Sequence, residues 1–393
     1  MGVMRVAIVH DWLSTFTGAE KVLEQMLLCY PGADLFVLVD HLPEADRGFL
    51  SGVKITTSNL QRRPLSRSVF RNFIGSMPYL VEQFDLKAYD LVLSSSWAFA
   101  KGVLVNADQP HVSYMHTPIR YASALKHQYL EQSNLTSGPK SWFVRRVLHS
   151  IRQWDLTSTN GVDTLIANSR YIAQRIRKTY RREAQVIYPP VDVDAFPLIE
   201  EKDDFYLMAS RLVPYKRFDL VIEAFRQMPD KRLTVAGSGP EAEKLKRLAG
   251  DNVQLLGFVP QDALVDMMQR AKAFIMPAEE DFGIVVAEAQ ACGTPVISFG
   301  RGGAPEILQL EGAAGPTGLV FHEQTPEAVI DAVERFETQQ GHYRPRDCWE
   351  NAQSFGPERF REEFKASVDD TLAGFARGAL AVRAPVFSLK SAE

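Results

Sequence analysis

The chain repeats one pattern twice, in which short apolar runs alternate with amphipathic helical segments. The first set of apolar runs occupies residues 5–11, 34–39, 90–96, 111–116, 163–169 and 184–190, and the second set occupies residues 205–210, 232–238, 253–257, 273–277, 294–299 and 318–321. Continuous apolar runs of this length are typical of parallel strands that are buried on both faces. The sequence therefore predicts an α/β protein with two Rossmann-like, doubly wound domains that face each other across a cleft.

The predicted domain boundary lies in a stretch rich in proline and acidic residues. Residues 189–204 interrupt the alternation and predict an interdomain linker. The N-terminal domain then covers residues 1–188 and the C-terminal domain residues 205–354. Residues 355–377 read as terminal helix, and the tail 378–393 has no clear periodicity.

Two glutamates flank a turn that opens a predicted helix in the second domain. Glu280 and Glu288 have seven residues between them in PAEEDFGIVVAEAQACGT. The free N–H groups at the start of such a helix suit a phosphate, while the carboxylates can accept hydroxyl groups. An ordinary helix with acidic residues near its start is the alternative. The ligand-binding interpretation gives six candidates: Glu280, Phe282, Gly283, Ile284, Val285 and Glu288.

Two cations follow the first strand of the second domain. Arg211 and Lys216 come directly after the apolar run 205–210 and just before an amphipathic helix. They are therefore expected at the carboxyl edge of the parallel sheet, where α/β proteins bind nucleotides. Arg211 can contact one phosphate through its guanidinium and Lys216 the other as a point charge. Solvated surface cations are the alternative.

An ordered set of motifs resembles the retaining glycosyltransferases of family 4, which have the GT-B fold. The matching segments are VAIVHDWLSTFTGAEKVL, YMHTPIRY, ANSRYIAQRI, IYPPVDVDAF, SRLVPYKRFD, VAGSGPE, VQLLGFVP and EEDFGIVVAEAQACGTPVISFGRGGAPEIL, and they span nearly the whole chain. The resemblance implies that the last helix packs back on the N-terminal domain. It also implies that Glu288 holds the ribose of a nucleotide-sugar donor and that Glu280 holds the sugar hydroxyls.

The resemblance extends to the loops of both domains. His116 ends the strand run 111–116, and the matching histidine of the family donates to the transferred sugar; a structural histidine is the alternative. The loop before the first helix matches the Gly-Gly loop of the family, but Thr17 replaces the first glycine. The remaining candidates are Gly18, Gly237, Phe258 and Val259 for the donor and Thr117, Arg120 and Tyr121 for the acceptor or sugar.

The expected reaction needs neither a cofactor nor a metal. The one Asp-x-Asp pair, Asp192 and Asp194, lies in the predicted linker, where turn and cap chemistry explains it. The histidines have no metal-ligand spacing. Cys29, Cys292 and Cys348 have no paired spacing either, which favours a reducing compartment. We therefore expect the nucleotide sugar to be a substrate, with no metal bound.

Charge and hydropathy bear on the partners. The net charge of −4 argues against a nucleic-acid binder. No segment reads as a signal peptide or a membrane span. Residues 61–79 and 142–154 are locally basic and aromatic, as expected of helices that lie on anionic lipid or hold a lipid diphosphate. Core-packing helices with solvated arginines are the alternative. The expected location is cytoplasmic, peripheral at the inner face of the cytoplasmic membrane.

The resemblance to mannosyltransferases of O-antigen and exopolysaccharide assembly favours GDP-mannose as the donor. The acceptor is then expected to be a growing, lipid-linked surface polysaccharide or oligosaccharide. A UDP-hexose or another nucleotide sugar stays open as the donor. Two other classes also stay open: a sugar-nucleotide 2-epimerase of the same fold, which would need no acceptor, and a non-catalytic nucleotide-sugar-binding protein, which donor turnover would exclude.

Overall fold

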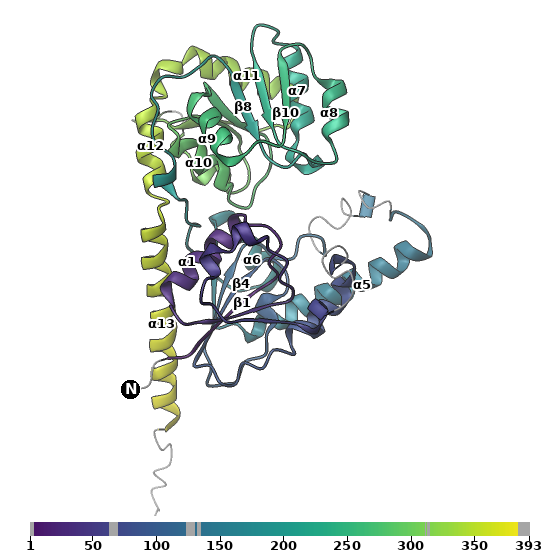
Figure 1. The fold of residues 1–393 in the computed structure, drawn as a ribbon, viewed down its shortest axis with the longest axis vertical. Coiled ribbons are helices and arrows are strands. Elements are labelled where there is room, and N and C mark those ends of the chain that lie inside the picture. Colours follow the sequence, from purple (N-terminus) through teal and green to yellow (C-terminus); the bar gives the residue numbers. More distant parts are fainter. Residues whose placement is uncertain are drawn as a thin grey trace, which may run out of the picture. The chain divides into compact units, whose positions relative to one another are not determined.

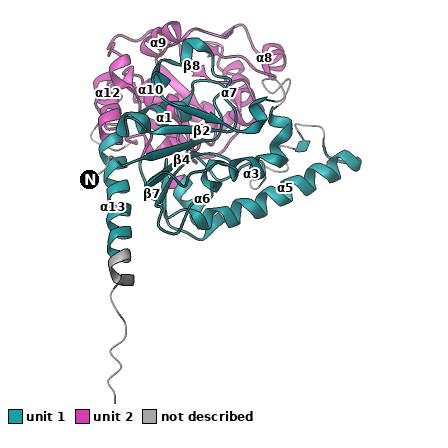
Figure 2. Ribbon diagram, turned by 60° about the horizontal axis from the view of Figure 1, so that its bottom comes forward, with its two compact units in different colours: residues 1–168, 172–187, 361–393 teal, residues 169–171, 188–360 magenta. Residues whose placement is uncertain are grey.

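The computed structural model describes residues 4–62, 70–122, 130–131, 135–310, 312 and 315–383. The chain forms two compact units (Figures 1 and 2). Unit 1 consists of residues 1–168, 172–187 and 361–393, and unit 2 of residues 169–171 and 188–360. Each unit is a parallel sheet with helices, which confirms the predicted pair of Rossmann-like domains.

Unit 1 is built on seven parallel strands in the order β3-β2-β1-β4-β5-β6-β7. The strands are β1 Val6–His10, β2 Asp34–Val37, β3 Ile55–Thr57, β4 Leu91–Ser96, β5 His111–Met115, β6 Thr164–Ala167 and β7 Gln185–Val186. The α-helices are α1 Gly18–Cys29, α3 Met77–Val81, α5 Gly138–Ser158, α6 Arg170–Tyr180, whose first two residues group with unit 2, and α13 Pro357–Arg383. Short 3₁₀ turns are η1 Glu44–Asp46, η2 Gly48–Leu50, η3 Asn59–Arg62, η4 Phe70–Ser76, η5 Ala100–Gly102 and η6 Thr159–Gly161.

Unit 2 is built on six parallel strands in the order β10-β9-β8-β11-β12-β13. The strands are β8 Tyr206–Ala209, β9 Leu233–Ala236, β10 Val253–Gly257, β11 Ala273–Met276, β12 Val296–Phe299 and β13 Gly318–Phe321. The helices are α7 Phe218–Arg226, α8 Ala242–Leu248, α9 Gln261–Arg270, α10 Ile284–Ala291, α11 Pro326–Thr338 and α12 Pro345–Gln353, with 3₁₀ turns η7 Val193–Ala195, η8 Pro214–Lys216, η9 Ala304–Glu306 and η10 Gln340–His342.

The sheet of unit 2 is buried on both faces, which explains why its strands read as continuous apolar runs. Along β8, Tyr206 and Met208 belong to one hydrophobic cluster, with α7 and α11. Leu207 and Ala209 belong to a second cluster, with α9, α10 and α12. Because successive side chains of a strand point to opposite faces, a strand covered on both sides needs apolar residues at every position.

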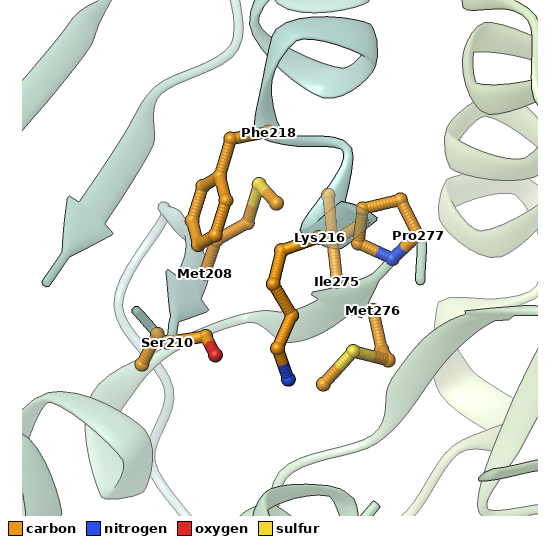
Figure 3. A pocket seen from close by; sticks show the side chains of 8 residues that line it. Met208, Ser210, Lys216, Phe218, Ile275, Met276 and Pro277 are labelled. Atoms are coloured by element: carbon orange, nitrogen blue, oxygen red, sulfur yellow. The ribbon is translucent and has the colours of Figure 1, made fainter. Parts of the chain in front are cut away.

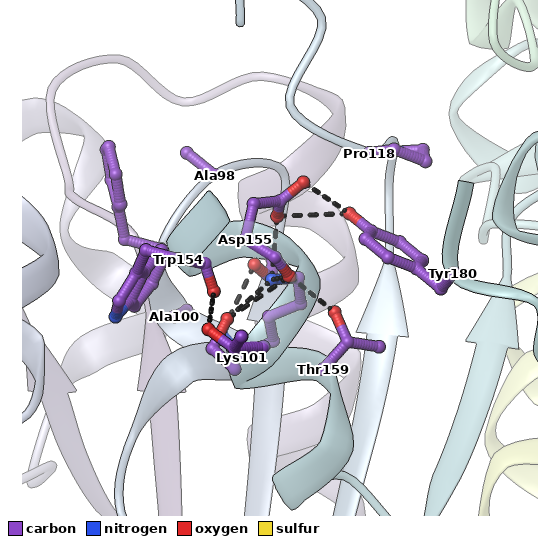
Figure 4. A network of polar contacts seen from close by, with 12 residues as sticks. Ala98, Ala100, Lys101, Pro118, Trp154, Asp155, Thr159 and Tyr180 are labelled. Atoms are coloured by element: carbon purple, nitrogen blue, oxygen red, sulfur yellow. Dashed lines mark hydrogen bonds and ion pairs between the residues drawn. The ribbon is translucent and has the colours of Figure 1, made fainter. Parts of the chain in front are cut away.

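A buried ion pair ties α5 to the sheet of unit 1 (Figure 4). The Lys101 ammonium lies 2.7 Å from the Asp155 carboxylate and has no solvent exposure. Tyr180 donates to both Asp155 oxygens at 3.0 Å, and Lys101 also lies over the Trp154 ring. A buried ion pair is tolerated when its remaining hydrogen-bonding capacity is filled, as it is here. Of these four residues, the sequence pointed only to Trp154, as the end of the basic and aromatic stretch 142–154.

The end of the chain differs from the prediction. Helix α13 continues to Arg383, whereas the sequence predicted that the helix ends at residue 377. From Arg361 onward the helix groups with unit 1, the unit that holds the predicted N-terminal domain. The rest of the tail, residues 384–393, lies outside the described residues.

Candidate functional site

The site of unit 2 forms where the strand order of the sheet reverses. Strands β8 and β11 are neighbours, and each has its other partner on the opposite side. Lys216 follows β8 and Glu280 follows β11, so both residues lie at the carboxyl edge of the sheet at this switch point. Open α/β sheets bind ligands at such points. The topology thus brings together two residues that are 64 positions apart in the sequence.

Lys216 and Glu280 form a close ion pair. The Lys216 ammonium donates to Oε1 of Glu280 at 2.5 Å, and the two side chains are 14% and 15% exposed. The lysine also lines a small pocket at the end of β8 and β11, together with Ser210 and Phe218 (Figure 3). A cation and a carboxylate this close can contact the phosphate and the sugar of one nucleotide-sugar molecule.

The turn before α7 fixes where Lys216 stands. Arg217 has left-handed backbone angles, φ 55° and ψ 37°, which are unusual for a residue other than glycine. Its guanidinium donates to Gln324, and the Gln324 amide donates to the carbonyl oxygen of Pro277. These bonds tie the lysine turn to the end of β11. Strained backbone held by its surroundings is frequent at functional sites, and the sequence analysis missed both Arg217 and Gln324.

The helix α10 begins as the sequence predicted. Gly283 caps it with φ 94°, in the left-handed region that favours glycine. The N–H groups of Ile284 and Val285 belong to the first turn, where a helix supplies no acceptor. The side chain of Phe282 is buried against the rings of Tyr188 and Phe355, so it packs in the core and leaves only its main chain for a ligand.

The other predicted donor residues have different surroundings. Arg211 is exposed. Glu288 is half-buried on α10. Phe258 is 79% exposed just after β10, and Val259 packs against the core. Gly237 has a packing role, because a Cβ there would lie 1.9 Å from the carbonyl oxygen of Ser210.

The glycine turn after β12 packs on the Glu280 loop. The Gly303 N–H donates to the carbonyl oxygen of Glu280 at 2.8 Å, and Gly302 forms an isolated bridge with Glu280. A Cβ at Gly302 or Gly303 would lie 2.5 or 2.4 Å from a carbonyl oxygen of this loop. Only glycines permit such a close approach of two backbones. This turn leads directly into the 3₁₀ turn η9.

In unit 1, His116 stands just after β5 with a neutral ring. Its Nε2 is 2.8 Å from the Ser95 hydroxyl oxygen, and the rings of Tyr114 and Trp97 lie 5.2 and 5.8 Å away. Desolvation lowers the pKa of His116 to about 3. A neutral imidazole can donate or accept a hydrogen bond but brings no charge to a ligand.

The residues predicted to act beside His116 make hydrogen bonds and packing contacts within unit 1. The Thr117 hydroxyl donates to the carbonyl oxygen of Pro118 and accepts from Arg175. Arg120 is half-buried, and Tyr121 packs against the hydrophobic core. These contacts fix the loop that follows His116.

The loop before α1 shows how Thr17 replaces a glycine. Thr17 has extended backbone angles, which any residue can adopt, and Gly18 begins the helix. The Glu20 carboxylate accepts from both the N–H and the hydroxyl group of Thr17, at 2.9 and 2.7 Å. A glutamate at the third position of a helix that accepts from the N–H of the capping residue satisfies one free donor at the start of the helix and stabilises it.

The residues that the structure describes contain no group of three or more His, Cys, Asp or Glu side chains placed to hold a metal ion. Among them, no helix is both long and apolar enough to cross a membrane.

Two family models together match residues 17–355 of the chain. Residues 17–195 match the model of Glycosyltransferase Family 4, and residues 192–355 match that of Glycosyl transferases group 1. A GDP-mannose-dependent alpha-(1-6)-phosphatidylinositol monomannoside mannosyltransferase of Mycolicibacterium smegmatis is 30% identical over 205 residues, which are 44% of this chain and 53% of the relative. A GDP-mannose-dependent monoacylated alpha-(1-6)-phosphatidylinositol monomannoside mannosyltransferase of Corynebacterium glutamicum is 43% identical over 144 residues, which are 32% of this chain and 36% of the relative. The chain thus spans about half or less of these curated relatives.

Solved structures show the same fold over almost the whole chain. Anabaena HepE in complex with UDP and glucose superposes with a TM-score of 0.65 at 19% identity, over 93% of this chain and 100% of that one. Sucrose-phosphate synthase of Thermosynechococcus elongatus gives a TM-score of 0.68 at 16% identity, over 94% and 100%. At this level of identity the similarity concerns the arrangement of the elements.

Proposed function

Because the chain belongs to the family 4 glycosyltransferases with the GT-B fold, we propose that it transfers a hexose from a nucleotide diphosphate sugar to a glycan acceptor with retention of configuration. The observation that carries this proposal is the Lys216–Glu280 pair at the switch point of unit 2, 2.5 Å apart and largely buried. A nucleotide-binding edge with a cation for phosphate and a carboxylate for sugar hydroxyls fits this reaction.

The proposed chemistry stabilises the departing nucleoside diphosphate. Arg211, Lys216 and the first N–H groups of α10 would bind the charge that develops on the diphosphate, an electrostatic contribution of the oxyanion-hole kind. Glu280 would hold the sugar hydroxyls and Glu288 the ribose, and the neutral His116 would hydrogen-bond the transferred sugar. With these groups we propose attack on the same face, in which the leaving phosphate oxygen takes the acceptor proton and no metal is required.

GDP-mannose is the donor that we propose. The names of the relatives at 30% and 43% identity, which are GDP-mannose-dependent mannosyltransferases, support this choice. A UDP-hexose or another nucleotide sugar is the alternative donor, and epimerisation of the nucleotide sugar is the alternative reaction. A thermal-shift panel with GDP, UDP, dTDP and ADP sugars tests the base, because a ligand at 100 times its Kd stabilises the protein by about 2.7 kcal/mol. Product analysis with GDP-mannose then separates transfer from epimerisation.

For the acceptor we propose a lipid-linked glycan at an anionic membrane surface. The two basic stretches of the sequence are adjacent in unit 1, since a Cβ at Gly75 in η4 would lie 3.0 Å from Val147 of α5. Figures 1 and 2 show the N-terminal end of α5 reaching beyond the sheet of this unit. Trp142 and Phe143 are 66% and 62% exposed there. The names of the relatives, which include phosphatidylinositol mannosides, are in keeping with a lipid-linked acceptor.

The charges near the start of α5 suit an anionic surface. Lys140 and Arg146 are exposed, and residues 138–154 include no acidic residue. Arg145 and Arg152 are half-buried and bond within the unit, to the Ser141 hydroxyl and to His149. Exposed aromatic residues beside exposed cations are typical of a helix end that rests at a lipid interface. Arg63 and Arg67 of the other stretch lie outside the described residues.

Vesicle binding tests this part of the proposal. The double change Lys140→Ser and Arg146→Ser should weaken binding to anionic vesicles about thirtyfold, since each cation near such a surface contributes about 1 kcal/mol. Donor hydrolysis should be unchanged, because the proposed donor residues lie in unit 2. Arg177→Ser with Lys178→Ser, two exposed cations of α6, serves as the matched control. If both double variants lost vesicle binding equally, the loss would reflect the net charge of the protein, and the proposed α5 site would be refuted.

A further inference from the structure

Three residues at the start of α6, the residue before the helix and its first two residues, belong to unit 2, although the segments on both sides of them belong to unit 1. These residues, Ser169–Tyr171, form the anchor tripeptide. They lie within the motif ANSRYIAQRI, which takes part in the family resemblance but received no role from the sequence.

The anchor tripeptide bonds to both sides of Glu280. The Ser169 hydroxyl donates to the carbonyl oxygen of Asp281 at 2.5 Å. The Tyr171 hydroxyl donates to the Glu279 carboxylate. Both bonds are long-range, joining residues 112 and 108 positions apart. The residues immediately before and after Glu280 are thus held by one short segment.

A second set of bonds holds the anchor tripeptide itself. The N–H groups of Arg170 and Tyr171 each donate to one oxygen of the Glu306 carboxylate, both at 2.8 Å. Tyr188 also donates to this carboxylate, at 3.1 Å. Glu306 belongs to η9, directly after the glycine turn that packs on the backbone of Glu280. Backbone N–H bonds to a carboxylate are charge-assisted and are stronger than bonds between neutral groups.

We propose that the anchor tripeptide is a positioning element for Glu280, which holds this carboxylate at Lys216 and at the sugar of the donor. The inference rests on the proposed function, because it assigns the anchor tripeptide to the same donor site. The Glu280 loop has two supports, the glycine turn and the anchor tripeptide. Neither Ser169 nor Tyr171 is proposed to touch the donor; each acts through the loop.

The mechanism predicts an effect on turnover rather than on nucleotide binding. In the proposed site the nucleoside diphosphate binds to Arg211, Lys216 and the start of α10, whereas the anchor tripeptide bonds to the residues on both sides of Glu280. A sugar contact that is out of place by about 1 Å can cost on the order of a hundredfold in rate. Tyr171→Phe removes one hydroxyl group and keeps the ring, so it is the smallest change that releases the loop.

Kinetics of the Tyr171→Phe variant form the first test. We expect kcat with the donor that the wild type accepts to fall about tenfold or more, while the Kd of the free nucleoside diphosphate stays within about twofold. In a Glu280→Gln background the same change should have no further effect, because the tyrosine acts through that carboxylate. Tyr206→Phe is the matched control: it removes another tyrosine hydroxyl bonded to a glutamate of unit 2, Glu337 at 2.9 Å, and should keep full kcat.

A crystal structure of Tyr171→Phe gives a readout that needs no activity. We expect the Lys216–Glu280 contact to lengthen or to adopt two conformers. A contact unchanged at 2.5 Å, full kcat, or a loss that simply adds to that of Glu280→Gln would each overturn the anchor role. A wild-type protein that turns over no nucleotide sugar would instead overturn the proposed function, and the crystal structure would still decide whether the anchor tripeptide positions Glu280.

Discussion

Removing the charge of Lys216 should separate the stability of unit 2 from its activity. The lysine and Glu280 lie 2.5 Å apart with side chains only 14% and 15% exposed. Lys216→Met keeps most of the volume of the side chain and deletes its charge. The Glu280 carboxylate then stays largely buried without its partner, which is the costly way to break such a pair.

The size of the effect follows from this geometry. At 2.5 Å and an effective dielectric constant of about 20, the attraction is about 6–7 kcal/mol, much of which the desolvation of both groups offsets. Removing one partner of a buried pair costs about 3–5 kcal/mol, and we expect about 3 kcal/mol because both side chains retain some exposure. The double change Lys216→Met with Glu280→Gln leaves no unpaired charge and should recover most of this loss.

Activity should not recover with stability. Each single variant removes a charge-assisted contact to the donor, worth about 1.5–3 kcal/mol, or about a ten- to 150-fold loss of kcat/KM. Lys216→Met should lose this amount with every nucleotide sugar that the wild type uses, because the phosphates are common to all of them; Arg211→Ala should do the same. The double variant should be stable and still inactive.

Urea unfolding and donor turnover measure the two effects in the same preparations. Lys231→Met is the matched control, since Lys231 pairs with Glu337 at the same 2.5 Å in the same unit; it should lower stability and leave turnover intact. Near-normal turnover in Lys216→Met would refute the assignment of this lysine to phosphate. A double variant as unstable as the single ones would refute the account of the buried pair.

Three further predictions test other parts of the account. EDTA should leave the rate of transfer unchanged, and a requirement for Mn²⁺ or Mg²⁺ would reopen a role for Asp192 and Asp194. Gly303→Ala should abolish most activity, because its Cβ would lie 2.4 Å from a carbonyl oxygen of the Glu280 loop; a fully active variant would contradict this packing. Burial lowers the pKa of His111 to about 4, so its contribution to stability is complete above pH 6.5 and falls between pH 6.5 and 4, by about 2 kcal/mol at pH 5. Urea unfolding at pH 7 and 5 should show a smaller difference in His111→Gln, and an equal difference would contradict the assignment.

The fold could be predicted because each strand carries its own signal. Twelve apolar runs correspond to twelve of the thirteen strands of the two sheets. The missed strand, β3 Ile55–Thr57, is three residues long, half-buried and at the edge of its sheet. It lacks the continuous apolar run that burial on both faces imposes, so nothing local distinguishes it from a loop.

The place of Lys216 and Glu280 at one edge of the sheet of unit 2 could also be predicted from the sequence. Lys216 and Glu280 each follow an apolar strand, and the rule that ligands bind at the carboxyl ends of parallel strands placed them at one edge. The sequence did not supply their distance, which depends on β8 and β11 being neighbours. It also missed Arg217, because left-handed backbone angles have a clear sequence signal only at glycine or asparagine.

The long-range contacts of the anchor tripeptide could not be predicted from the sequence. Ser169 lies two residues after the end of β6, and the sequence places it in the apolar run 163–169 of the first domain. Its partner in the Glu280 loop stands more than a hundred positions later. Gly283 and the glutamates account for the interpretation of that loop, and nothing in its sequence indicates that a distant segment supports it. A serine and a tyrosine carry no charge and no periodicity that would point across this separation. Only the packed unit brings them to the Glu280 loop, and therefore the residues that we propose to position Glu280 lie in a motif that the sequence places in the other domain.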